Sequence, residues 1–136
     1  MDSDSAHSSI EPSGGGDSVA AQWNLLRTEQ TYYRRFLDHD LIEAVYAHPR
    51  LRVLFPFTSV ATLHLSRCTR YPFSFDIPCV VSDYGGGFDV IRTPKMVAGP
   101  RMIGVGVTVS EAVALIAAHL PHGCGPAIEA TAENLR

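Results

Sequence analysis

The chain has 136 residues, a formal net charge of −3 at pH 7, 46% hydrophobic residues and 18% charged residues. These values indicate one globular domain with a single core, and they exclude a disordered chain and a basic nucleic-acid-binding domain. The chain has no apolar run of about 18 residues and no basic, apolar secretion signal at its start, so we expect a cytoplasmic protein without a membrane span.

The first 17 residues are rich in Ser, Gly and Asp. They contain too little apolar surface to fold, so we expect residues 1–17 to form a disordered tail. Residues 18–136 should form a single domain. The chain has three cysteines with no close pair, which fits a reducing compartment.

Three helical stretches are expected before the middle of the chain. Asp17 or Ser18 can cap the first, because apolar residues at helical spacing follow them. A second stretch covers about 28–37. The third covers 41–48, has Asp residues before it as candidate caps, and should end where Pro49 disfavours helical backbone in the preceding residue.

The middle of the chain shows the alternation of β-strands. In 61–68, Leu63 and Leu65 alternate with polar residues, which predicts a half-buried strand. The glycine-rich stretch 83–88 predicts a hairpin turn. Further strands are expected over 77–84, 87–93 and, weakened by two glycines, 102–109.

The last helix has the clearest sequence signal. Thr108 and Glu111 form the pattern of a capping box, a broad apolar face follows, and Pro121 should end the helix. A final turn is expected within 128–136. The predicted fold class is α+β, with N-terminal helices, a small antiparallel sheet of three to four strands, and a C-terminal helix packed on the sheet.

The polar face of the 61–68 strand is the first candidate site. His64, Ser66 and Cys68 form a row opposite Leu63 and Leu65. A His beside a Ser or Cys can activate that residue as a nucleophile, so the row is a candidate catalytic group. It has no evident carboxylate to orient the imidazole, and the alternative is a polar strip that faces solvent or a helix.

The stretch HLPHGCG is the second candidate. His119, His122 and Cys124 are metal-ligand types at short spacing, but no fourth ligand is evident and a helix end explains them equally, so no metal is expected. Cys124, between two glycines and near His122, is a further candidate nucleophile or a structural thiol. The glycines at 85–87 and 104–106 lack the phosphate-binding patterns, so no nucleotide or other cofactor is expected.

The third candidate is a groove in the basic middle of the chain. From Arg50 to Arg101 there are seven basic and three acidic residues, a surplus of four positive charges that could receive an anion. Aromatic residues and prolines are interleaved with the arginines, so they could wall a groove for a precursor peptide or a small metabolite. Core aromatics and solvated arginines are the alternative. The candidate substrate-binding residues are Arg52, Ser59, Arg67, Arg70 and Tyr71.

The sequence also resembles a known family. The run HPRLRVLFPFTSVATLHLSRCTRYPFSFDIPC, residues 48–79, resembles the core signature of the actinobacterial domain-of-unknown-function 6193 family of natural product biosynthesis proteins. The stretches SEAVALIAAHLP and HGCGPAIEATAENL are similar to the closing segment of that family, so the resemblance covers about 22–136. Members often carry His where this chain has Val60.

The resemblance implies a role in secondary metabolism but no known catalytic residues. We expect a tailoring or cyclisation subunit that acts, beside partner tailoring enzymes, on a ribosomal peptide precursor of lanthipeptide-like type. His64 would then move protons and the arginines would hold carboxylates. The alternative is a non-catalytic binding module that recruits or stabilises a partner biosynthetic enzyme. Thiol-dependent acyl transfer through Cys124 is a third possibility, and no oligomeric state is predicted.

Overall fold

The computed structural model describes residues 14–28, 38–59, 61–83, 85–93, 95–96 and 99–135. The helices are α2 (Gly16–Thr28), α4 (His39–Ala47), α5 (Val109–Ala118) and a short 3-10 helix (Ala132–Asn134). The strands are β1 (Phe55–Ser59), β2 (Thr62–Ser66), β3 (Cys79–Ser82), β4 (Phe88–Ile91) and β5 (Met102–Val107). In these ranges no helix combines the length and apolar character needed to cross a bilayer.

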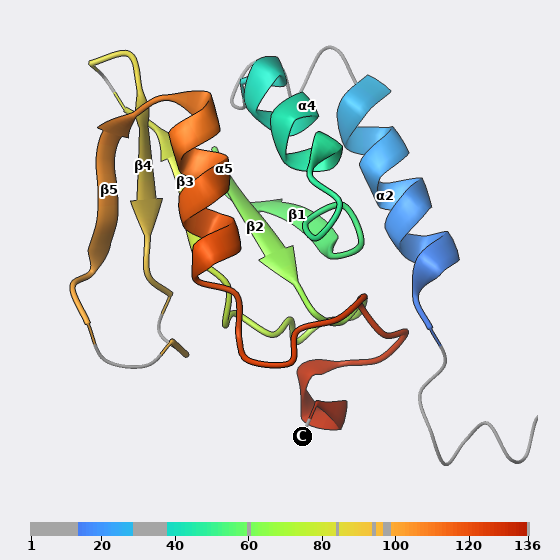
Figure 1. The fold of residues 1–136 in the computed structure, drawn as a ribbon. Coiled ribbons are helices and arrows are strands. Elements are labelled where there is room, and N and C mark those ends of the chain that lie inside the picture. Colours follow the sequence, from blue (N-terminus) through green and yellow to red (C-terminus); the bar gives the residue numbers. More distant parts are fainter. Residues whose placement is uncertain are drawn as a thin grey trace, which may run out of the picture.

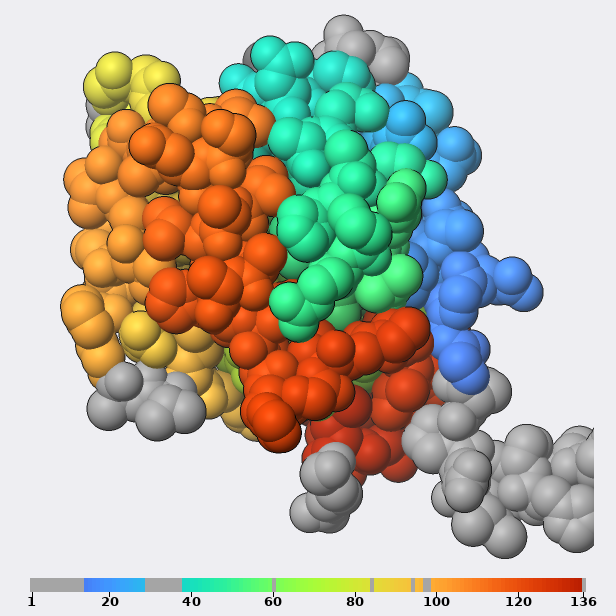
Figure 2. Space-filling view, viewed as in Figure 1, coloured from blue at the N-terminus to red at the C-terminus, as the bar shows by residue number. Residues whose placement is uncertain are grey.

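The five strands form one antiparallel sheet in chain order, β1-β2-β3-β4-β5. Figure 1 shows that α2, α4 and α5 all lie against the same face of this sheet. On that side α4, α5 and the C-terminal segment form a closed surface in the space-filling view (Figure 2). The α+β class and the packing of the C-terminal helix on the sheet are therefore confirmed.

The core lies between the helices and one face of the sheet. The strand register aligns Leu63 with Val80 and Val80 with Val90, and all three side chains are buried. Because side chains alternate along a strand, the residues between them face the other side, where the structure places no helix over the strands it describes. Gly104 lets α5 approach the sheet, since a Cβ there would lie 2.6 Å from Leu115 Cδ1.

The predicted ends of the later helices are confirmed, but the predicted start of the first is wrong: α2 begins at Gly16, so Asp17 and Ser18 lie within its first turn instead of capping it. Asp38 caps α4, its Oδ1 accepting a hydrogen bond from the Leu41 amide at 3.1 Å. His48 takes an extended conformation before Pro49 and ends that helix. Both hydrogen bonds of the Thr108–Glu111 capping box are present in α5.

Two predicted segments lie mainly outside the described residues. The helical stretch predicted for 28–37 is described only at Thr28, and the predicted tail only from Gly14. At the end of that tail, the Gly15 amide donates to the Ala127 carbonyl at 3.0 Å and α2 begins at Gly16.

The sheet has one strand more than the three to four predicted. The additional strand is β1, whose five residues pair with the whole of β2. Pro56 lies within β1, and a proline weakens the sequence signal of a strand because it cannot donate a ladder hydrogen bond. The fold tolerates it because β1 is at the edge of the sheet.

The C-terminal segment, residues 126–135, connects distant parts of the chain. The Ala127 amide donates to the Val53 carbonyl and the Ile128 amide donates to the Arg67 carbonyl, each at 3.0 Å. The Thr69 amide donates back to the Ile128 carbonyl at 3.0 Å. This segment therefore holds the start of α2, the turn before β1 and the loop after β2 together.

Candidate functional site

A cleft of about 600 Å³ lies on the sheet face opposite the helices. Its residues come from β1 to β4, from the loop after β2 and from the connection between β4 and β5. They are Ser59, Thr62, His64, Phe75, Cys79, Ile91, Arg92, Thr93, Lys95 and Arg101. The cleft has the size of small-molecule binding sites, which occupy roughly 300–1,000 Å³ in known proteins.

His64 is the central polar side chain of this cleft. Its ring stacks on Phe57, with centroids 4.8 Å apart and planes 7° from parallel, and it meets Phe75 edge to face at 5.7 Å. Burial lowers the pKa of His64, which favours the neutral imidazole near pH 7. Neutral imidazole has one nitrogen that donates and one that accepts, so His64 can bind either kind of polar group.

Three of the residues that line the cleft are cationic, and none of its lining residues is acidic. Arg92, Lys95 and Arg101 all belong to the stretch 91–104, which contains no Asp or Glu in the sequence. Arg92 is fixed by a hydrogen bond from its Nε to the Pro100 carbonyl at 2.9 Å. The Arg92 amide also donates to the Arg101 carbonyl at 2.7 Å, which brings the two arginines opposite each other.

The loop 67–78 forms an aromatic wall beside the sheet. Phe73 stacks on Phe57 at a centroid distance of 4.1 Å, and Phe75 meets the same ring edge to face at 5.6 Å. The hydroxyl of Thr93 donates to the Phe75 carbonyl. Phe75 has a positive φ of 51°, a conformation that is unusual for a bulky residue and that the surrounding contacts impose. Contacts from two strands and a loop thus fix Phe75 at the cleft.

The predicted catalytic row does not form one site. His64 lines the cleft, whereas Ser66 and Cys68 are fully buried beneath the loop that follows them. The Ser66 hydroxyl donates to the Cys68 carbonyl at 2.8 Å and accepts from the amides of Cys68 and Ser74 at 3.1 and 3.2 Å. The structure therefore uses Ser66 to shape the loop, and burial raises the pKa of the Cys68 thiol.

Of the predicted substrate-binding residues, only Ser59 lines the cleft. Arg67 donates through Nε and Nη2 to Asp76, and this pairing raises the pKa of the guanidinium. Arg70 lies 3.5 Å from Glu129. Arg67 and Arg70, which the sequence suggested as ligand-binding residues, are therefore paired with acidic residues of the protein itself.

The other two predicted substrate-binding residues lie elsewhere. Tyr71 is 77% exposed and contacts Phe73 edge to face at 5.9 Å. Arg52 lies on the helical side of the molecule, with its Cζ 5.9 Å from the centre of the Tyr46 ring. It lines a smaller hollow of about 290 Å³ between α2 and the C-terminal segment.

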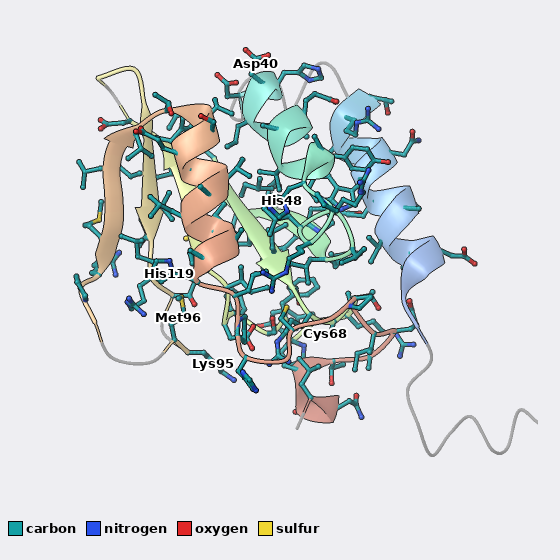
Figure 3. The ribbon with its side chains drawn as sticks, in the orientation of Figure 1. Asp40, His48, Cys68, Lys95, Met96 and His119 are labelled. Carbon is teal, nitrogen blue, oxygen red and sulfur yellow. The ribbon has the colours of Figure 1, made fainter. Side chains whose placement is uncertain are left out.

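The stretch HLPHGCG also remains separate from the cleft. His119 ends α5, with its Nδ1 2.8 Å from the Leu115 carbonyl oxygen, and His122 is exposed. Cys124 is half-buried, and burial raises the pKa of its thiol, which disfavours the nucleophilic thiolate. Within the described ranges, no group of three His, Cys, Asp or Glu side chains is placed to hold a metal ion. Figure 3 shows Lys95 and Met96 on the connection after β4, whereas Cys68 lies beside the C-terminal segment.

Sequence reasoning missed seven of the residues that line the cleft. Thr62, Cys79 and Ile91 lie on the open face of their strands, a placement that strand alternation could have given once the strand order was known. Cys79 is only 7% exposed, and burial raises its thiol pKa. The other missed residues are Arg92, Lys95 and Arg101, whose sequence signal is three cations in a stretch without acids. Thr93 lies among them and also lines the cleft.

No curated protein and no solved structure matches this chain. One family model matches residues 17–131, a span that includes all five strands, α4, α5 and all of α2 except its first residue. The chain therefore belongs to the family of unknown function DUF6193.

Proposed function

We propose that the protein is a small ligand-binding component of natural product biosynthesis that holds a precursor or intermediate in the cleft on the open face of the sheet. The observation that carries this proposal is the cleft itself, which has about 600 Å³ of space and a mixture of apolar and polar walls. Few such hollows exist per protein, and a well-formed one is the usual place for a ligand.

Binding without conversion fits the chemistry of the cleft better than catalysis does. The thiol that lines the cleft belongs to Cys79, and its raised pKa keeps it protonated near neutral pH. His64 lies there without a carboxylate among the lining residues to orient it. Ser66 and Cys68, the other members of the proposed catalytic row, are committed to the loop after β2.

A second candidate function is the tailoring or cyclisation of a lanthipeptide-like precursor, with His64 as the base. The observation that favours it is the lowered pKa of His64, because a neutral imidazole can accept a proton from a bound group. In either case the protein would work in the cytoplasm beside partner tailoring enzymes, and a side chain or terminus of a peptide would occupy the cleft.

The binding proposal is tested by filling the cleft. Ser59→Trp places a bulky ring on an exposed position that lines the cleft, and strands tolerate aromatic residues well. Ser82→Trp makes the same change on β3 at an exposed position outside the cleft. Native mass spectrometry after incubation with the small-molecule fraction of the source cells should show a ligand on the wild type and on Ser82→Trp, but not on Ser59→Trp.

Equal ligand retention by both tryptophan variants would contradict the proposal, as would the absence of any ligand from the wild type. Product formation in the source cells then separates the two candidate functions. A His64→Gln chain that supports normal product levels indicates binding alone. Loss of product, with the ligand still bound by this variant, indicates that His64 takes part in the chemistry.

A further inference from the structure

We infer that the ligand of the cleft is a small organic anion, with an oxyanion group at the basic rim and a flat apolar body against the aromatic wall. The oxyanion is a carboxylate, sulfonate or phosphate bound by Arg92, Lys95 and Arg101. This inference rests on the proposed function of the cleft and adds the chemical class of what the cleft holds.

The basic rim, formed by Arg92, Lys95 and Arg101, has a local excess of positive charge. Three of the ten lining residues are cationic and none is acidic, in a chain whose net charge is −3. The basic rim is thus a local concentration of charge, and such a concentration attracts anions. Asp89 lies on the same sheet face but outside the lining residues, and its Oδ1 accepts a hydrogen bond from the Gly106 amide at 3.0 Å.

Three arginines outside the cleft have acidic partners in the described part of the chain. Their pairs are Arg27–Glu43, Arg67–Asp76 and Arg70–Glu129. Lys95 and Arg101 are exposed, and neither forms an ion pair with any acidic residue in the described part of the chain. Their charges are therefore available to an anion from solution.

The rim is also partly preorganised. The Arg92 guanidinium packs so closely on Gly99 that a Cβ there would lie 2.7 Å from Arg92 Nη2. The same guanidinium donates to the Pro100 carbonyl, and the backbone pairing of Arg92 with Arg101 fixes the bases of both side chains. A rigid arginine loses less conformational entropy when it binds an oxyanion, and its planar fork suits the geometry of such a group.

The interior of the cleft favours an apolar body for the rest of the ligand. Phe75 and Ile91 supply apolar surface, and the His64 ring offers a third contact beside Phe75. Aromatic rings bind planar groups by stacking or edge-to-face contact, which makes a flat apolar body the best match. A polyanion such as a nucleic acid fits poorly, because it needs a long basic surface rather than a short cleft with three cations.

Two fluorescent probes of matched shape test the inference. The anion 8-anilinonaphthalene-1-sulfonate carries a sulfonate on an aromatic body, and N-phenyl-1-naphthylamine is the same body without the charge. We expect the wild type to bind the sulfonate at least about tenfold more tightly than the neutral probe, which corresponds to one or two charge-assisted contacts. Added salt should weaken the binding of the sulfonate probe and leave the binding of the neutral probe unchanged.

The double variant Lys95→Gln/Arg101→Gln should weaken binding of the sulfonate about tenfold and leave the neutral probe unchanged. Arg50→Gln is the matched control, since it removes an exposed arginine that does not line the cleft. Equal affinities for the two probes in the wild type, or equal losses in the double variant and in Arg50→Gln, would overturn the inference. Thermal unfolding of each variant verifies that it is folded.

The outcome also separates the inference from the proposed function. If Ser59→Trp abolishes binding of the neutral probe but the sulfonate has no advantage in the wild type, the cleft binds ligands and the anion inference is wrong. If Ser59→Trp reduces the binding of neither probe, both the binding function and the anion inference are wrong.

Discussion

The imidazole of His64 lies flat on the ring of Phe57, 4.8 Å away and 7° from parallel, across the pairing of β2 with β1. Phe75 closes a second side of the imidazole edge to face. The polar residue at the centre of the cleft is therefore held by aromatic contacts rather than by a carboxylate. This arrangement restricts the orientation of the imidazole, which lines the cleft. It also affects how the stability of the protein depends on pH.

We predict that stability falls as the pH falls through the titration range of His64. Burial places its pKa in the folded protein below the unfolded value of about 6.5, so the unfolded chain takes up a proton more readily. Above both pKa values His64 adds no pH dependence. As the pH falls from the pKa of His64 in the unfolded chain to its pKa in the folded protein, the stability decreases by at most about 1.4 kcal/mol per pH unit. Urea unfolding of the wild type and His64→Gln from about pH 7.5 to about pH 5 measures this difference.

His122→Gln is the control for this experiment, because His122 is an exposed residue outside the cleft. It should retain the pH dependence of the wild type, whereas His64→Gln should lose part of it. If the unfolding free energy changed with pH equally in all three proteins, His64 would not be desolvated in the folded state.

We predict that Gly104→Ala destabilises the protein by about 1 kcal/mol, the lower end of the usual cost of overpacking. The added Cβ would lie 2.6 Å from Leu115 Cδ1 and 3.2 Å from Val107 Cγ1, so the end of the Leu115 side chain would have to move where α5 meets the sheet. Gly125→Ala is the matched control, since its added methyl group would meet no atom within 4 Å. Thermal unfolding compares the two variants, and equal midpoints would contradict close packing at Gly104.

We predict that Ser66→Ala lowers stability without changing affinity for the probes. The variant leaves the buried amides of Cys68 and Ser74 without their acceptor, a loss of roughly 1–3 kcal/mol. Ser110→Ala, on the exposed side of α5, should change little. Denaturant unfolding and probe titration well below the melting temperature measure both effects. If Ser66→Ala kept its stability but lost affinity for the probes, Ser66 would belong to the binding site.

We predict that the three cysteines differ in their reaction with iodoacetamide. Cys68 and Cys79 are buried and have raised thiol pKa values, so they should react only when the protein opens. Cys124 is half-buried and should react first, though slowly, because burial raises its pKa as well. Peptide mass spectrometry after timed labelling gives the order. Rapid labelling of Cys68 in the native protein would contradict its structural role.

The parts of the fold that the sequence predicted are those whose signal is local. The capping box at Thr108 needs only two residues three positions apart, and the helix that ends before Pro49 needs only a steric rule. The strand β2 was evident from the alternation of Leu63 and Leu65. In contrast, β1 was missed because Pro56 obscures it, and its recognition needs knowledge that it lies at a sheet edge.

The candidate site was harder to predict because it depends on which segments become neighbours. Sequence reasoning named His64 and Ser59 as candidate site residues, and both line the cleft, but it could not foresee that Asp76 would form an ion pair with Arg67. It counted Arg92 and Arg101 in the basic middle without giving them a role. Their place at the cleft follows from the pairing of β4 with β5, which local sequence does not reveal.

The hydrogen bonds of the C-terminal segment have a consequence for biosynthesis on the ribosome. Gly15, Val53, Arg67 and Thr69 all find backbone partners at Ala127 and Ile128, which are made later in translation than all four. Buried backbone groups without partners are costly, so the earlier segments cannot complete their native contacts before those two residues leave the exit tunnel. Stalled nascent chains that lack them should stay sensitive to protease, and protection should appear abruptly once they emerge.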